Sequence, residues 1–215
     1  MQNDLETNNP GCGQVDYPAI LEQVKSEESE EIAAALLHEL PLVWSRAYQE
    51  MTPRPTDICV FSVGTFEYIF DDYATLVATG QAPNEPDSEA RLVAALGRSR
   101  PAKRSRDDAR LRGWVGPTER YFGKAWDKGH FMAHTIGGAV EGIEANVFVQ
   151  RRDLNRGWSA PGKRFRAMEK YCFSNPDTFC FNRPLYTDGS AKPSFFEFGV
   201  LKGSKELWIE CFDNR

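Results

Sequence analysis

The stretch that decides the fold runs from residue 126 to residue 170 and reads WDKGHFMAHTIGGAVEGIEANVFVQRRDLNRGWSAPGKRFRAMEK. It places His130, Asn146 and Asn155 in one short unit, together with a dense set of Arg and Lys side chains. An imidazole can take a proton from water near neutral pH, an amide oxygen is a neutral hard ligand for Mg²⁺, and cations hold phosphates. This combination indicates metal-dependent cleavage of a phosphodiester.

The order of residue types in this stretch predicts a strand, a turn, a second strand and a helix. Residues 131–136 are mostly apolar and end at the turn pair Gly137-Gly138, so we expect the first strand there, with His130 at or just before its start. Residues 146–150 contain the run Val-Phe-Val, which is typical of a strand. Residues 165–171 have the composition of a helix.

These residues resemble the DNA/RNA non-specific endonucleases, a family with a ββα-metal (His-Me finger) core. The family's Asp-Arg-Gly-His signature is similar to Asp127-Lys128-Gly129-His130. Its Asn-x-x-x-Gln followed by Leu-Asn-x-Gly resembles residues 146–150 and 154–157, and its later helical Glu is most similar to Glu169. The resemblance covers about residues 124–172, and three motifs in the family's order are more specific than one.

The resemblance implies that His130 is the general base that activates water and that Asn155 is the direct ligand of one Mg²⁺, or of Mn²⁺ in its place. The family arginine is Lys128 here, which keeps the charge but loses the bidentate fork that fits a phosphate. The expected catalytic residues are His130, Lys128, Asn146 and Glu169, and the expected metal residues are Asn155 and Asp127.

Three of these assignments have alternatives. Asn155 and Glu169 are 14 residues apart, about 21 Å along an unbroken helix, so both serve one ion only if the chain folds back, which we expect at Pro161-Gly162. Asn146 could instead tie strand ends together through bonds to the backbone. His130 and His134 have the spacing of a zinc protease helix but lack the intervening glutamate, so we interpret His134 as structural.

Charge is distributed unevenly along the chain. Residues 1–97 carry 4 Lys and Arg against 17 Asp and Glu, a net charge of −13, whereas residues 98–170 carry 17 against 8, a net charge of +9. A polyanion such as DNA or RNA would be drawn to the second region. The basic side chains near the motif could form a solvated helix face, but their crowding favours substrate binding. The expected nucleic-acid-binding residues are Arg151, Arg152, Arg156, Lys163, Arg164 and Arg166.

Composition and hydrophobic pattern predict an α+β protein in two regions. Residues 1–97 are predicted to form an acidic, mostly helical region, either a separate domain or packed on the core. Residues 98–215 are predicted to contain an antiparallel sheet, and the resemblance implies that they form a ββα-metal nuclease domain. A long helix should begin near Ser26 or Ser29 and bury Ile32, Leu36, Leu40, Val43, Ala47 and Met51, with Pro41 kinking or splitting it.

The remaining elements follow from local patterns. Residues 58–70 fit a helix or a strand equally well, and residues 88–96 predict a helix. Residues 98–112 are interpreted as a basic linker. Residues 179–186, 194–201 and 206–212 predict strands.

The cysteines and the first residues bear on the compartment. The chain has five cysteines and no C-x-x-C pair, so a reduced, cytoplasmic protein is expected, although Cys172 and Cys180 could bridge a short loop in an oxidising compartment. The first residues lack a secretion signal, and no stretch approaches a membrane span, so no membrane contact is expected. Delivery by a specialised secretion machine would leave no such mark.

The function that these features predict is a metal-dependent endonuclease that hydrolyses DNA, RNA or both with little sequence specificity. Relatives of the ββα-metal core occur as toxins and in defence systems, so the resemblance also implies a toxin or defence effector. A neutralising immunity protein or a delivery partner would then bind the acidic N-terminal region. The alternatives are a catalytically inactive nucleic-acid-binding module and a protein-interaction domain that uses the acidic region.

Overall fold

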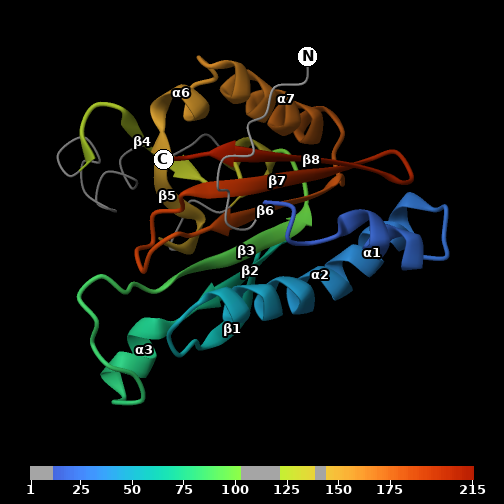
Figure 1. Cartoon of the computed structure of the whole chain (residues 1–215). Coiled ribbons are helices and arrows are strands. Elements are labelled where there is room, and N and C mark those ends of the chain that lie inside the picture. Colours follow the sequence, from blue (N-terminus) through green and yellow to red (C-terminus); the bar gives the residue numbers. More distant parts are fainter. Residues whose placement is uncertain (1–11, 103–121, 139–143) are drawn as a thin grey trace, which may run out of the picture.

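Six antiparallel strands form the main sheet of the computed structural model, which describes residues 12–102, 122–138 and 144–215. The strand order is β1-β2-β3-β6-β7-β8 (Figure 1). The strands span Ile58–Val63 (β1), Phe66–Asp71 (β2), Arg91–Arg98 (β3), Phe179–Leu185 (β6), Phe195–Lys202 (β7) and Glu206–Asp213 (β8). This antiparallel sheet, combined with helices, confirms the predicted α+β class.

Helices cover both faces of the sheet. α2 (Ser29–Met51) lies along one face, and α6 (Arg152–Asn155) and α7 (Ala160–Ser174) lie over the other (Figure 1). Because successive strand residues point to opposite faces, Ala95 packs into the core beneath α7, and Leu96 packs into the core beneath α2. The sheet therefore supports two hydrophobic cores, one for each layer of helices.

Strand β3 corrects the prediction of a helix at residues 88–96. Its first seven residues, 91–97, are buried, because helices cover the sheet on both sides at this central strand. A strand buried on both faces is apolar throughout and loses the period-two pattern that would distinguish it from a buried helix. The predicted boundary at residues 97 and 98 falls inside β3, and β3 pairs with both β2 and β6. One sheet thus crosses that boundary.

Of the N-terminal helices, α2 packs largely as its pattern predicts, whereas the two shorter helices, one before it and one after it in the chain, were not predicted. α1 (Tyr17–Gln23) is capped by the Asp16 carboxylate, which accepts a bond from the Ala19 N–H. α2 runs without a break through Pro41, so the expected split does not occur. Its predicted buried face is confirmed at four of the six positions, whereas Val43 is half-buried and Met51 is exposed. A third helix, α3 (Tyr73–Ala78), follows β2.

The strand, turn, strand, helix unit is present, but its first strand lies earlier than predicted. β4 (Trp126–His130) pairs antiparallel with β5 (Val147–Arg151), and His130 is the last residue of β4. Residues 131–133 leave the ladder, and His134–Ile136 form a 3-10 turn, η1. The Asn146 side chain bonds both the N–H and the C=O of Met132. The backbone groups of Met132 are therefore satisfied without a partner strand. The predicted strand at residues 131–136 is therefore wrong.

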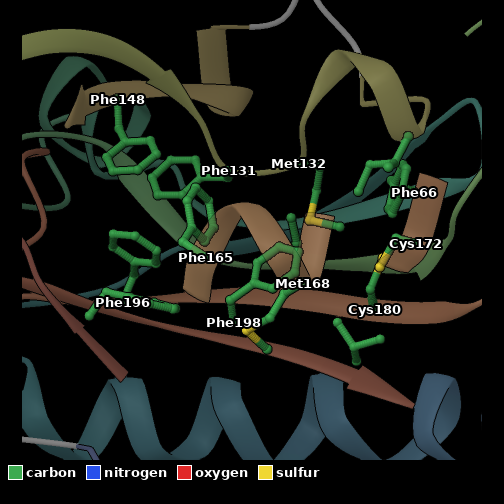
Figure 2. Close-up of a cluster of buried hydrophobic side chains, with 14 of the residues drawn as sticks. Phe66, Phe131, Met132, Phe148, Phe165, Met168, Cys172, Cys180, Phe196 and Phe198 are labelled. Atoms are coloured by element: carbon green, nitrogen blue, oxygen red, sulfur yellow. The ribbon is translucent and has the colours of Figure 1, made fainter. Parts of the chain in front are cut away.

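An aromatic cluster fixes this unit on the sheet (Figure 2). Phe131 stacks on Phe148 with ring centroids 4.2 Å apart, and Phe148 meets Phe196 of β7 edge to face at 5.6 Å. Phe165 of α7 contacts the same Phe196 ring at 5.4 Å. The two hairpin strands and α7 are thus held to one another through the same core, which sets the position of His130, the residue before Phe131.

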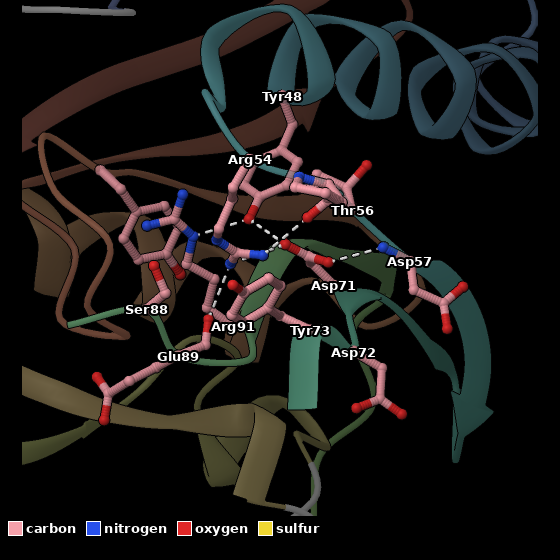
Figure 3. Close-up of polar contacts among 12 residues, drawn as sticks. Tyr48, Arg54, Thr56, Asp57, Asp71, Asp72, Tyr73, Ser88, Glu89 and Arg91 are labelled. Carbon is pink, nitrogen blue, oxygen red and sulfur yellow. Dashed lines mark hydrogen bonds and ion pairs between the residues drawn. The ribbon is translucent and has the colours of Figure 1, made fainter. Parts of the chain in front are cut away.

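A buried polar cluster joins the end of α2 to the sheet (Figure 3). The Tyr48 hydroxyl donates to Oδ2 of Asp71 at 2.7 Å and accepts a bond from Nε of Arg91 at 2.7 Å. Arg54 pairs with the same Asp71 carboxylate at 3.0 Å, and its guanidinium lies 3.8 Å from the centroid of the Tyr73 ring. This cluster connects α2, β2, β3 and α3.

The cysteines differ from the expectation of a fully reduced chain. Cys12 and Cys211 form a disulfide whose Cα atoms are 6.2 Å apart, which links the N-terminal segment to β8. Cys172 and Cys180 are buried free thiols, so the bridge considered for them is absent. Two cysteines that lie 199 residues apart in sequence give no local signal of pairing.

Candidate active site

Several polar residues of the motif line one cavity of about 380 Å³. Its walls come from the hairpin, from η1 and from helices α6 and α7. The lining residues with polar side chains are Lys128, His130, His134, Thr135, Gln150, Asn155, Arg166 and Glu169. Four of the predicted catalytic and metal residues are therefore brought together, namely Lys128, His130, Asn155 and Glu169.

The chain reversal that unites Asn155 with Glu169 lies before Pro161-Gly162. α6 ends at Asn155, and Gly157 adopts a left-handed conformation with φ of 69°. The Ser159 hydroxyl caps the new helix by accepting a bond from the Gly162 N–H at 3.1 Å. Pro161 occupies the first turn of α7, where no backbone N–H is needed. The expected fold-back is thus confirmed, but the residues that make it are 156–159.

His130 stands at the end of β4, and its neighbour Gly129 makes room for Gln150. A Cβ atom at Gly129 would lie within 3 Å of three atoms of the Gln150 side chain, so the glycine allows that side chain to cross the strand. Gln150 is fully buried and lines the cavity. Neither its Oε1 nor its Nε2 has a hydrogen-bond partner among the described residues. A buried amide with unmet bonding capacity is a place where water or a ligand binds.

Asp127 was predicted to bind metal, but its carboxylate is already occupied. It accepts bonds from Arg152 at 2.9 Å, from Arg156 at 2.7 and 3.0 Å, and from Nδ2 of Asn155 at 3.2 Å. Burial alone would raise the pKa of Asp127, but the hydrogen bonds from Arg156, Arg152 and Asn155 outweigh it and lower that pKa. Asp127 does not line the cavity. The Asp127 carboxylate thus holds the amide nitrogen of Asn155, so the amide oxygen is the candidate ligand atom of that side chain.

Asn146 was predicted to be catalytic, but it lies outside the cavity lining. It is fully buried, its Oδ1 accepts a bond from the Met132 N–H at 2.8 Å, and its Nδ2 donates to the Met132 C=O at 3.0 Å. These two bonds fix the backbone at Met132, two residues after His130. This geometry matches the alternative role of Asn146, in which its side chain bonds to the backbone.

Burial shifts the pKa values of two lining residues, Glu169 and Lys128, in opposite directions. Glu169 is buried, and burial raises its pKa against the influence of Arg166, whose Nη1 lies 2.8 Å from Oε2. Burial lowers the pKa of Lys128. In both cases the low-dielectric surroundings disfavour charge, and perturbed groups in a cleft are typical of functional sites.

All five of the predicted nucleic-acid-binding arginines form ion pairs within the chain. Arg151 pairs with Asp153, and Arg152 and Arg156 pair with Asp127. Arg164 pairs with Glu210, and Arg166 pairs with Glu169. Lys163 is exposed on α7. Of the six predicted residues, Arg166 alone lines the cavity, so the others can contact a substrate only outside it.

Several lining residues were missing from the predicted site, among them Gln150 and Phe173. Gln150 belonged to the quoted Asn-x-x-x-Gln motif, and that motif was the available signal. Phe173 lies one residue before the end of α7 with 50% of its surface exposed. Nothing in the sequence distinguishes it from an ordinary core phenylalanine. His134, interpreted as structural, also lines the cavity.

Two features are absent from the residues that the structure describes. No cluster of three or more His, Cys, Asp or Glu side chains there could hold a metal ion. Within the same residues, no helix has the length and apolar character needed to cross a membrane.

Comparison with known proteins assigns no family. No protein-family model matches the chain, and no curated protein matches it. Among solved structures, it is similar to the Sda1 nuclease with a bound zinc ion, with 11% identity and a TM-score of 0.37, over 79% of this chain and 81% of that one. It is also similar to an extracellular endonuclease, with 12% identity and a TM-score of 0.34, over 77% and 81%. At these TM-scores the likeness determines neither the family nor the activity of this chain.

Proposed function

We propose that this protein is a metal-dependent endonuclease with a ββα-metal core that hydrolyses the phosphodiester bonds of DNA, RNA or both. The observation that carries the proposal is the convergence of Lys128, His130, Gln150, Asn155 and Glu169 on one cavity. They come from β4, β5, α6 and α7, in the order of the sequence motif.

The donor set of the cavity fits a hard cation. Asn155 has an amide oxygen to offer because Asp127 engages its nitrogen at 3.2 Å. The buried Gln150 amide has unmet bonding capacity in the same cavity. Mg²⁺ is usually held by few side chains together with waters and substrate phosphates, and Mn²⁺ accepts similar ligands. When bound, such an ion supplies polarisation of the phosphoryl oxygen and stabilisation of the leaving oxygen.

The residues of the chain account for the other parts of the reaction. The His130 imidazole accepts the proton of the attacking water at a ring nitrogen. The water oxygen bonds to phosphorus, and the bond from phosphorus to the leaving sugar oxygen breaks. Lys128 presents its ammonium group to the phosphate, and Arg166 adds a second cation at the cavity wall. Glu169 orients water in the outer shell.

The test is cleavage of plasmid DNA and of total RNA by the purified protein with Mg²⁺, with Mn²⁺ or with a chelator. We expect cleavage with the metals and none with the chelator. His130→Ala should remain folded by circular dichroism and lose about 10²- to 10⁴-fold in rate, as the loss of a general base does. A folded His130→Ala protein that cleaves like the parent would contradict the assignment of the base.

The same test separates the alternatives. A protein that binds nucleic acid with a steep salt dependence but never cleaves it would be the inactive binding module. A protein that neither binds nor cleaves nucleic acid would favour the alternative of a protein-interaction domain. A toxin or defence role, with a neutralising partner at the acidic N-terminal region, is a further proposal. It rests on the resemblance alone and is tested by expressing the protein in a bacterial host and scoring growth.

A further inference from the structure

One part of the cavity lining is apolar. Phe173 lies there, with half of its surface exposed. Ala102, Ala133 and Thr135, also part of the lining, have small side chains. The phenyl ring is therefore the large apolar surface of this cavity. An exposed phenylalanine alone is unremarkable, but one that lines the candidate site has a location that points to a ligand.

The helix geometry of α7 relates this ring to the proposed reaction centre. Arg166, Glu169 and Phe173 follow one another at steps of three and four residues, so they share one face of the helix. All three line the cavity, whereas Phe165, Met168 and Cys172 pack into the core. Phe173 stands one turn beyond Glu169, a rise of about 6 Å.

The end of α7 that carries Phe173 is fixed to the sheet and to η1. The Ser99 hydroxyl donates to the C=O of Cys172 at 2.9 Å, and the Arg100 N–H donates to the C=O of Ile136 at 2.8 Å. The residues after β3 thus bridge the last turn of α7 and the 3-10 turn. Phe173 is held in place by its helix without being covered.

From this arrangement we propose that Phe173 stacks on an unpaired base next to the scissile phosphate, so that the enzyme prefers single-stranded or locally unpaired nucleic acid. The inference rests on the proposed function and goes further by naming the form of the substrate. Every base has a π-face, so one aromatic platform binds all four bases and gives little sequence specificity. In a duplex both faces of a base are occupied by its neighbours, and exposing one requires unstacking.

The test uses single-stranded oligonucleotides with one cleavable linkage, all other linkages being phosphorothioate. One set has normal bases, and two sets have an abasic site on the 5′ or the 3′ side of that linkage. Phe173→Leu keeps apolar bulk without an aromatic face, and Phe173→Tyr keeps the ring. Leu42→Ala serves as the matched control, because Leu42 is an exposed apolar residue of α2, on the far face of the sheet.

With normal bases, Phe173→Leu should lower kcat/KM by about 5- to 150-fold, the factor that stacking of one base is worth. Phe173→Tyr and Leu42→Ala should stay close to the parent. On one of the two abasic substrates, Phe173→Leu should cleave as fast as the parent, because the base that it would contact is gone. The parent should also cleave the single strand faster than the matched duplex.

Equal losses for Phe173→Leu on normal and both abasic substrates, or no loss on any of them, would overturn the proposal. A parent that cleaves none of the oligonucleotides would instead refute the proposed function. In that case fluorescence anisotropy in chelator decides separately about Phe173. Phe173→Leu should weaken binding of the normal strand but leave binding of one abasic strand unchanged, and a uniform effect would rule out base stacking.

Discussion

In the proposed metal site, the amide of Asn155 is oriented by a neighbour, Asp127, that would not itself touch the metal. Asp127 receives four N–H groups, and one of them is Nδ2 of Asn155. The side chain of Asp127 is only 12% exposed. Ligands of metals are commonly oriented by such outer partners, and their removal typically weakens metal affinity by about 10- to 100-fold. The carboxylate of Asp127 fits this role better than that of a direct ligand.

Asp127→Asn should therefore raise the Mg²⁺ concentration for half-maximal cleavage, by about 10- to 100-fold. Its maximal rate at saturating metal should fall less. His130→Ala should show the opposite behaviour, with the metal requirement of the parent and a lower maximal rate. Asp153→Asn is the matched control, because Asp153 also pairs with an arginine, Arg151, and no hydrogen bond joins its carboxylate to Asn155 among the described residues. A Mg²⁺ titration of the cleavage rate distinguishes these outcomes, and an unchanged midpoint in Asp127→Asn would remove its positioning role.

At the scale of elements, the connection between α6 and α7 depends on one close approach. A Cβ atom on Gly162 would lie 2.4 Å from the C=O oxygen of Asp153 and 3.1 Å from the Cα atoms of Gly157 and Leu154. The first turn of α7 thus packs directly on the backbone of α6. This contact keeps Asn155, at the end of α6, beside the face of α7 that carries Glu169.

Gly162→Ala should force α6 and α7 apart. We expect a loss of about 1 to 3 kcal/mol in the free energy of unfolding, which is typical of overpacking, together with a lower cleavage rate. Urea unfolding followed by circular dichroism measures the first effect, and the Mg²⁺-dependent rate measures the second. Lys170→Ala, an exposed position on the same helix, should leave stability nearly unchanged. If Gly162→Ala is as stable and active as the parent, the close approach is not required.

Sequence patterns identified some elements well and missed others for physical reasons. β5 was predicted from its run Val-Phe-Val, and α7 was predicted from the helical composition of residues 165–171. β4 was missed because its residues WDKGH are mostly polar, while the apolar residues that follow turn into the core. β3 was mistaken for a helix because both of its faces are covered.

The residues that line the candidate site were also predicted only in part. His130, Lys128, Asn155 and Glu169 reached the cavity as the motif order indicated. Asp127 and Asn146 were predicted to take part in the reaction because the sequence shows only that they are polar residues of a motif. It does not show which groups their side chains bond to. Those partners are 25 to 29 residues away for Asp127 and 14 residues away for Asn146, so the sequence alone does not reveal them.

At the scale of the whole molecule, one sheet joins the acidic N-terminal region to the region of the motif. β1, β2 and β3 continue directly into β6, β7 and β8. The cluster of Tyr48, Arg54, Asp71 and Arg91 connects α2 to this sheet (Figure 3), and the Cys12–Cys211 disulfide fastens the N-terminal segment to β8. These links make the stability of the N-terminal region a property of the entire sheet.

The Tyr48 hydroxyl offers a way to test this link through pH. Burial, partly opposed by Arg91, raises the pKa of Tyr48 to about 12. In the unfolded chain the pKa is about 10. A group whose pKa is higher in the folded state stabilises that state fully below the unfolded pKa, and this contribution is lost as the pH rises through the folded pKa. The contribution of Tyr48 should thus be constant up to about pH 10 and decline between about pH 10 and 12.

The measurement compares the parent with Tyr48→Phe, using urea unfolding at several pH values between 8 and about 11.5. At pH 8 the variant should be less stable by about 1 to 3 kcal/mol, because Arg91 and Asp71 lose a buried hydrogen-bond partner. This difference should shrink toward pH 11.5, because the parent must then keep a buried hydroxyl protonated or ionise it beside the Asp71 carboxylate. The other tyrosines titrate in both proteins and cancel in the difference. A difference that stays constant with pH would show that burial does not raise the pKa of the Tyr48 hydroxyl in the folded protein.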